Sequence, residues 1–172
     1  MPVQRLNHAV LYVRDVGRSV AFYADALGFR TVMSMPGAAF LQAPGSSNDH
    51  DLGLFEVGQG AAQSRAGRGE VGLYHLAWEV DTLDELDRIR ARLAEVGALV
   101  GASDHSTTKA LYAKDPDGLE FEVSWLVPAD LITEDMIAGR GSIRPLDLAR
   151  EKARFGGHTR GGVGVSSPAT AR

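Results

Sequence analysis

The chain has 172 residues, of which 44% are hydrophobic and 23% are charged, and its formal net charge is −4. These values are typical of a globular protein with one domain or two small modules, and they exclude the basic surface expected of a nucleic-acid or membrane-surface binder. No apolar run approaches the ~20 residues of a membrane span, and the N-terminus lacks a signal-peptide pattern, so we expect a cytoplasmic protein. Cysteine is absent, so any metal would need His, Asp or Glu ligands.

Two segments of the chain repeat one pattern. Residues 6–29 and 73–99 each predict a strand, a polar turn and a helix that ends at a glycine, with His8 and His75 near the starts of the strands. Each helix is followed by three short β-like runs: 29–35, 38–44 and 50–57, then 98–104, 108–115 and 119–125. The repeat predicts an α+β protein made of two βαβββ modules.

The expected organisation has four parts. The modules cover residues 1–57 and 73–127, and a Gly-rich linker without periodicity, 58–72, joins them. The remainder, 128–172, contains two possible helical pieces and a Gly/Ser/Thr-rich end. We expect this extension to wrap the domain or a partner subunit and then to become flexible, leaving His158 in solvent.

Strand parity indicates a possible metal site. His75 alternates with Leu76 and Trp78 and so faces away from the helix layer, while Glu122 lies on the polar face of 119–125. Two imidazoles, from His8 and His75, and the Glu122 carboxylate form the ligand set of a facial triad. A single such histidine is better explained as a hydrogen-bonded core residue. The equivalent position of both histidines in the repeat favours the metal site.

Four further residues have roles that spacing alone leaves open. His105 and Tyr112 are explained as a loop histidine and a half-buried strand tyrosine, but beside a metal they could bind substrate oxygens and move protons. Either His50 or Glu56 could occupy in the first module the place of Glu122 in the second. Repeat spacing does not choose between them, whereas proton-transfer chemistry favours His50.

Residues 5–126 resemble the vicinal oxygen chelate superfamily, which includes glyoxalase I, drug-resistance proteins, epimerases and the type I extradiol catechol dioxygenases. The turn 115–118, "DPDG", followed four residues later by Glu122, is common to the superfamily and shapes the hairpin that presents the glutamate. The longer pattern from His105 through Tyr112 to Glu122 is similar to the extradiol dioxygenase signature. It departs at Ser103, where that signature has Gly or a β-branched or amide residue.

The resemblance implies a half-barrel cavity formed by paired modules, with Fe(II), less often Mn(II), held by His8, His75 and Glu122. It also implies a catechol-type substrate cleaved with O2. His50 would act as acid–base, and His105 and Tyr112 would hydrogen-bond the substrate oxygens. We expect a homo-oligomer, and pairing of the modules within or between chains stays open.

Other members of the superfamily offer alternative functions. A glyoxalase-like lyase, an epimerase or a fosfomycin-type transferase would use the same triad without needing His105 and Tyr112. A drug-binding resistance protein would typically lack the metal ligands. Many extradiol enzymes have four βαβββ units, and this chain has two.

Overall fold

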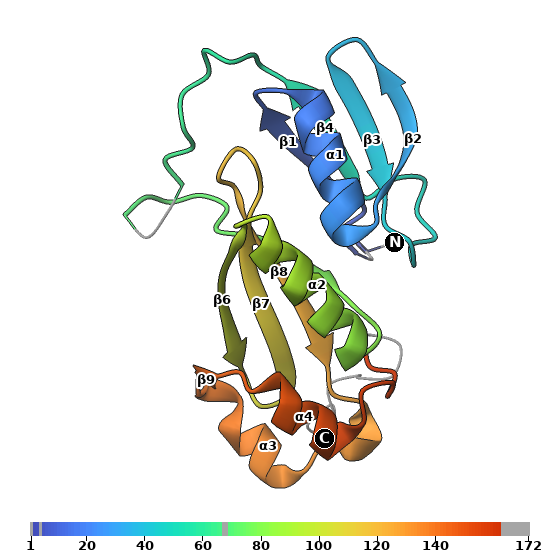
Figure 1. The fold of residues 1–172 in the computed structure, drawn as a ribbon, viewed down its shortest axis with the longest axis vertical. Helices are drawn as coiled ribbons and strands as arrows, with labels where there is room; N and C mark the ends of the chain where they lie inside the picture. Colours follow the sequence, from blue (N-terminus) through green and yellow to red (C-terminus); the bar gives the residue numbers. More distant parts are fainter. Residues whose placement is uncertain (1, 4, 67–68, 163–172) are drawn as a thin grey trace. The chain divides into compact units, whose positions relative to one another are not determined.

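The computed structural model describes residues 2–3, 5–66 and 69–162, which form two compact units (Figure 1). Unit 1 comprises Met1–Arg65 together with the turn Asp115–Gly118, and unit 2 comprises Ala66–Lys114 and Leu119–Arg172. The expected α+β class with two βαβββ repeats is confirmed. No helix in the described ranges is long and apolar enough to cross a bilayer.

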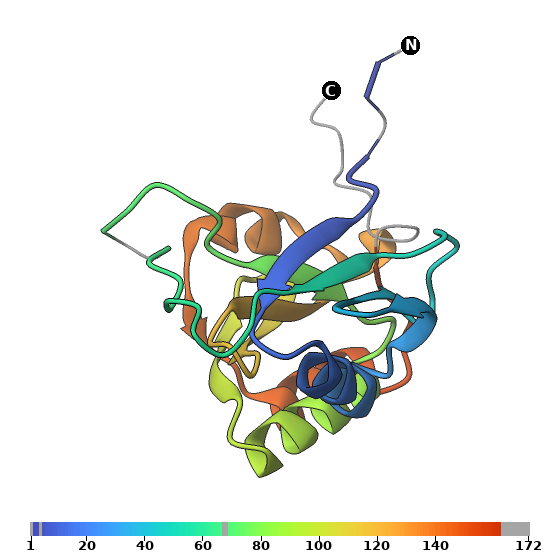
Figure 2. The ribbon, with the colours of Figure 1, turned by 90° about the horizontal axis from the view of Figure 1, so that it is seen from above.

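Unit 1 contains one helix packed on a four-stranded sheet. The sheet has the order β1-β4-β3-β2, in which β1 runs parallel to β4 and the other pairs are antiparallel. Helix α1 lies on one side of this sheet, as the end-on view in Figure 2 shows, and it packs on β3 and β4. The elements are β1 (Ala9–Val13), α1 (Val16–Leu27), β2 (Arg30–Met35), β3 (Ala38–Gln42) and β4 (Leu52–Glu56).

The ends of α1 follow from local chemistry. The Asp15 side chain accepts a hydrogen bond from the Arg18 N–H at the N-cap. Gly28 ends the helix with φ 74°, a conformation that glycine adopts without steric cost. Tyr23 and Leu27, on the predicted apolar stripe, are buried against the sheet.

Unit 2 repeats the same order of elements. Its sheet runs β5-β8-β7-β6-β9, again with the first two strands parallel. Helix α2 begins after Thr82, whose hydroxyl accepts from the Glu85 N–H, and it buries Leu86, Ile89 and Leu93. The elements are β5 (Leu76–Glu79), α2 (Leu83–Glu95), β6 (Leu99–Asp104), β7 (Thr108–Lys114) and β8 (Glu120–Leu126).

The C-terminal extension is part of unit 2. Strand β9 pairs antiparallel with β6 and so adds a fifth strand, and α4 packs on α2 (Figure 1). The predicted flexible end is 156–172, and its residues from 163 onward lie outside the described part of the chain. His158 is exposed, as expected, and its Nδ1 lies 2.9 Å from Asp84 Oδ2. The elements are η1 (Ala129–Leu131), α3 (Glu134–Ala138), η2 (Gly139–Gly141), β9 (Arg144–Pro145) and α4 (Leu148–Phe155).

The "DPDG" turn is anchored to α1 within unit 1. Gly118 has φ 80° and its N–H donates to the Asp115 carbonyl, so the predicted reverse turn is confirmed. The Tyr23 hydroxyl donates to Asp115 at 3.2 Å, and Arg14 pairs with Asp117 at 2.8 Å. Burial, then the Asp115 charge, raises the pKa of Tyr23 well above its ordinary value. The turn therefore has its own buried polar anchor.

Candidate functional site

Four of the predicted site residues gather on one face of the sheet in unit 2. Glu122 in β8 pairs across the strands with Ala77 of β5 and Tyr112 of β7, so these three side chains share a face. His75 precedes β5 by one residue and shares the parity of Ala77. His105 follows β6 and reaches Tyr112 from the β6–β7 turn.

His75 and Glu122 form a close pair. His75 Nε2 lies 3.3 Å from Glu122 Oε2, and both side chains are largely shielded from solvent. Two ligands bound to one cation at ~2.1 Å are about 3 to 3.5 Å apart, so this separation suits a shared metal. The other imidazole nitrogen, Nδ1, is buried and has no hydrogen-bond partner among the described residues. The two donors therefore fit a divalent cation.

His105 and Tyr112 form a second pair beside the first. His105 Nε2 and Tyr112 Oη are 2.8 Å apart. The rings of Tyr112 and His75 are 5.9 Å apart between centroids. Burial, followed by the charge on Glu122, raises the pKa of Tyr112, which keeps the phenol protonated around neutral pH. The pair is thus a hydrogen-bonding group next to two metal donors.

His8 and His50 come together in unit 1. Their ring centroids are 4.5 Å apart, and the Phe40 ring lies 5.0 Å from that of His50. Glu56 lies elsewhere, because its carboxylate accepts a hydrogen bond from the Val16 N–H at the start of α1. Between the two candidates that repeat spacing left open, the structure places His50 beside His8.

The predicted triad draws on both units. Unit 1 contains His8, and unit 2 contains His75 and Glu122. Within the described parts of the chain, no three His, Asp or Glu side chains form a metal-binding group. The triad as a whole, and the roles of His50, His105 and Tyr112, stay predictions.

Two features of unit 2 were not predicted from the sequence. Tyr74 places its ring 4.5 Å from that of His75, and alternation along the strand did not single it out. Lys109 is fully buried on the face of β7 opposite to Tyr112 and binds Asp104 and Glu151. Its position in "TKALYAK", in phase with the buried Leu111, was a usable signal, because a lysine on an apolar face requires a counter-charge.

Comparison with known proteins agrees with the fold. The model of the Glyoxalase/Bleomycin resistance protein/Dioxygenase superfamily matches residues 5–123, and the chain belongs to this superfamily. A crystal structure of a glyoxylase/bleomycin resistance protein/dioxygenase domain from Frankia sp. EAN1pec superposes with a TM-score of 0.60 at 23% identity, over 72% of this chain and 92% of that one.

Two relatives of known name belong to different classes of enzyme, a dioxygenase and a lyase. Catechol-2,3-dioxygenase of Bacillus subtilis is 34% identical over 69% of this chain, but the chain spans only 40% of that protein's length. Lactoylglutathione lyase of Neisseria meningitidis serogroup A is 29% identical over 69% of this chain and 88% of the lyase. These comparisons therefore establish the superfamily but not the reaction.

Proposed function

We propose that this chain is a metal-dependent extradiol dioxygenase that opens a catechol-type ring with O2. The observation that carries this proposal is the 2.8 Å contact between His105 and Tyr112, on the sheet face that carries Glu122. Lyase, epimerase and transferase chemistry does not require this pair. The similarity to a catechol-2,3-dioxygenase supports the same choice.

His75 and Glu122, joined by His8, would hold the metal, which we propose to be Fe(II), with Mn(II) as the less frequent choice. When bound, the metal supplies the Lewis acidity that ionises a catechol hydroxyl near neutral pH. Two neutral imidazoles and one carboxylate leave coordination positions open for small molecules. The donor set therefore suits a substrate with two adjacent oxygens.

The remaining residues would orient the substrate and move protons. Tyr112 holds its phenolic proton and can donate it in a hydrogen bond to a substrate oxygen. His105, whose Nε2 lies 2.8 Å from the Tyr112 hydroxyl, can accept a proton from it or return one to it. His50, beside His8 in unit 1, is proposed as a further acid–base group. A homo-oligomeric, cytoplasmic enzyme remains part of the proposal.

Anaerobic reconstitution with Fe(II), then 2,3-dihydroxybiphenyl or catechol and air, tests the reaction. We expect a yellow ring-fission product. His105→Ala and Tyr112→Phe should lower kcat by about 10²-fold or more, since each removes a proton-transfer or hydrogen-bonding group. His158→Ala is the matched control, because this histidine is exposed and lies on the C-terminal extension. Unchanged turnover in the His105 and Tyr112 variants would refute their assigned roles.

A glyoxalase-like lyase is the second candidate. The observation that favours it is the share of the relative's length that this chain matches, which is 88% for the lactoylglutathione lyase and only 40% for the dioxygenase. The hemithioacetal of methylglyoxal and glutathione should be tested on the same metal-loaded protein. Turnover of this substrate, with no product from a panel of catechols, would overturn the dioxygenase proposal.

The buried position of Lys109 argues against a fosfomycin-type transferase. Such an enzyme needs cationic groups for a phosphonate, and Lys109 is the one basic residue between His105 and Tyr112. Its ammonium is buried between Asp104 and Glu151, on the face of β7 away from Tyr112. A failure to take up any divalent metal would instead favour a small-molecule-binding protein.

A further inference from the structure

The turn that carries His105 has a strained backbone. It joins β6 to β7, and its middle residue, Ser106, has φ 69°. Among the residues that the structure describes, no other non-glycine residue has a positive φ. A side chain with a Cβ makes this conformation unfavourable, so it persists where the surroundings fix it. The contacts of Ser106 therefore show what holds the turn.

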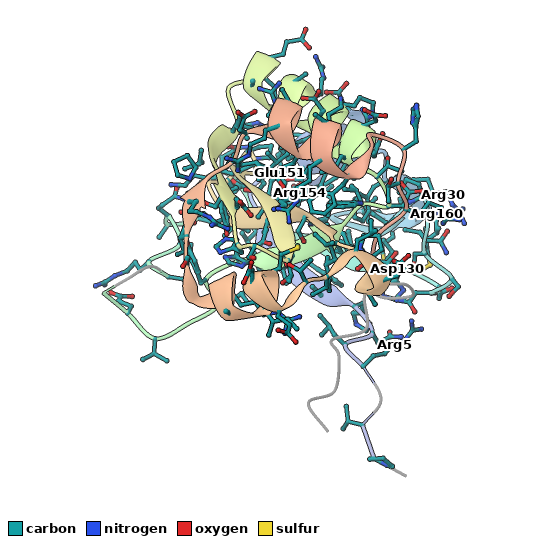
Figure 3. The ribbon with its side chains drawn as sticks, turned by 90° about the horizontal axis from the view of Figure 1, so that it is seen from below. Arg5, Arg30, Asp130, Glu151, Arg154 and Arg160 are labelled. Carbon is teal, nitrogen blue, oxygen red and sulfur yellow. The ribbon has the colours of Figure 1, made fainter. Side chains whose placement is uncertain are left out.

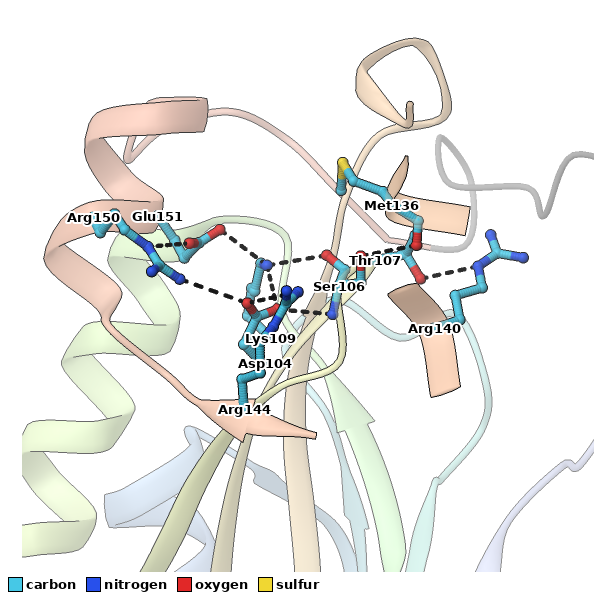
Figure 4. Close-up of polar contacts among 9 residues, drawn as sticks. All are labelled: Asp104, Ser106, Thr107, Lys109, Met136, Arg140, Arg144, Arg150 and Glu151. Carbon is cyan, nitrogen blue, oxygen red and sulfur yellow. Dashed lines mark hydrogen bonds and ion pairs between the residues drawn. The ribbon is translucent and has the colours of Figure 1, made fainter. Parts of the chain in front are cut away.

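All three polar groups of Ser106 are bonded (Figure 4). Its N–H donates to Asp104 Oδ1 at 2.8 Å, and its carbonyl accepts from Lys109 Nζ at 3.0 Å. Its hydroxyl donates to the Met136 carbonyl in α3 at 2.8 Å. The backbone groups of the strained residue are thus held by Asp104 and Lys109, and its side chain is held by the C-terminal extension.

Lys109 is itself held by two carboxylates. Its Nζ lies 2.6 Å from Asp104 Oδ1 and 2.9 Å from Glu151 Oε2. The side chains of Lys109, Asp104 and Glu151 are 0%, 3% and 1% exposed. Glu151 lies on α4 and is labelled in Figure 3 among the crowded side chains beside that helix. In such shielded surroundings each charge depends on its partners.

Glu151 lies outside the part of the chain that the superfamily model matches, which ends at residue 123. Glu151 contacts Lys109 on the helix side of the sheet, where Lys109 is buried. His105 contacts Tyr112 on the opposite side of the sheet. The same three-residue turn therefore connects a buried charge network with the hydrogen-bonding pair of the proposed site. Any change in the direction of the Lys109 ammonium acts directly on the Ser106 carbonyl, one residue from His105.

We propose that Glu151 is a positioning residue for His105: through Lys109 and the strained Ser106, it holds the imidazole at hydrogen-bond distance from Tyr112. The consequence for ring cleavage rests on the proposed function. The placement of His105 does not depend on that function, so the positioning role of Glu151 and the dioxygenase activity can fail separately.

The first experiment compares kinetics of the Fe(II)-loaded full chain and its Glu151→Gln variant. This substitution keeps the shape of the side chain and removes its charge. We expect kcat to fall by about tenfold or more, because small misplacements of a reacting group are costly, with KM changed by less than about twofold. Lys152→Met is the matched control, since Lys152 also fixes α4 to α2, through Asp84 and Asp87, without touching the turn.

The second experiment follows the imidazole itself by 15N NMR of the metal-free full chain, with His105 assigned from a His105→Gln variant. We expect the His105 ring signals to shift in Glu151→Gln and to stay at their wild-type positions in Lys152→Met. Unchanged His105 signals in Glu151→Gln, or equal effects in both variants, would overturn the proposal. The NMR comparison decides this even if no catechol is turned over, in which case the proposed function alone fails.

Glu151→Asp keeps the test decisive if Glu151→Gln does not fold. The substitution retains the negative charge but shortens the side chain by one methylene, so the carboxylate no longer reaches Lys109 Nζ at 2.9 Å. We expect shifted His105 ring signals and a lower kcat, and wild-type values for both would overturn the proposal.

Discussion

Lys109→Met should destabilise unit 2 strongly. The substitution replaces a buried ammonium by an apolar side chain of similar length and leaves Asp104 and Glu151, both almost fully buried, without their shared cation. Removing one partner from a buried ion pair costs roughly 3–5 kcal/mol. Arg150 lies 3.0 Å from Glu151 and 3.7 Å from Asp104, and the Ser106 N–H still binds Asp104. These contacts place the expected loss at the lower end of the range, about 3 kcal/mol.

Thermal and urea unfolding at pH 7 measure this loss. For a chain of this size, about 3 kcal/mol corresponds to a decrease in Tm of roughly 6–12 °C. The double variant Lys109→Met, Glu151→Leu should recover part of it, because fewer unpaired charges remain buried. A loss below about 1 kcal/mol for Lys109→Met would refute the view that the network depends on paired charges.

The pH dependence gives an independent check. Burial by itself raises the pKa of Asp104, but hydrogen bonds from Lys109 and the Ser106 N–H outweigh burial and lower it. In the wild type this stabilisation is present above the unfolded pKa of about 3.9, and it is lost as pH falls through the lower folded pKa. Without Lys109 we expect the folded pKa to rise. The difference between variant and wild type should therefore shrink as pH falls from 7 towards 4.

Three further predictions concern unit 1. Tyr23→Phe, which removes a buried hydrogen bond to Asp115, should cost about 1–2 kcal/mol by urea unfolding at pH 8. Because the folded pKa of Tyr23 is raised, its contribution to wild-type stability is lost as pH rises above the unfolded value of about 10, and the variant should show a flatter decline there. Arg14→Ala removes the side-chain partner of the mostly buried Asp117 and should cost about 1–3 kcal/mol in urea unfolding. Gly28→Ala places a Cβ at φ 74° and should lower stability by about 1–2 kcal/mol, and an unchanged Tm would contradict this.

The elements of both units could be predicted because their signals are local. The apolar spacing of α1 and α2 and the glycine after each helix depend on neighbouring residues alone. Strand parity likewise separates the Glu122 face from the buried face of β8, because side chains alternate with a fixed period. His8 and His75 were selected as candidate ligands because they occupy equivalent positions in the repeat, which neither strand shows by itself.

The contacts of the C-terminal extension could not be predicted in this way. Nothing near Glu151 indicates that it binds Lys109, because the two residues are distant in sequence and meet only when α4 packs in unit 2. Repeat spacing left the choice between His50 and Glu56 open for a related reason. Repeat spacing treats the two modules as identical, but Glu56 has a local partner, the N-terminus of α1, that spacing does not describe.

The two modules differ at the sheet edge that leads into the turn carrying His105. In unit 1 the edge strand is β2, whereas in unit 2 the corresponding strand, β6, is covered by β9 through Ser103 and Asp104. An edge strand left open is free to twist and fray, and pairing removes that freedom. The covered residues directly precede His105, so the extension fixes β6 where the turn begins. In the proposed function, the extension therefore stiffens the turn that carries His105, whose imidazole lies 2.8 Å from the Tyr112 hydroxyl.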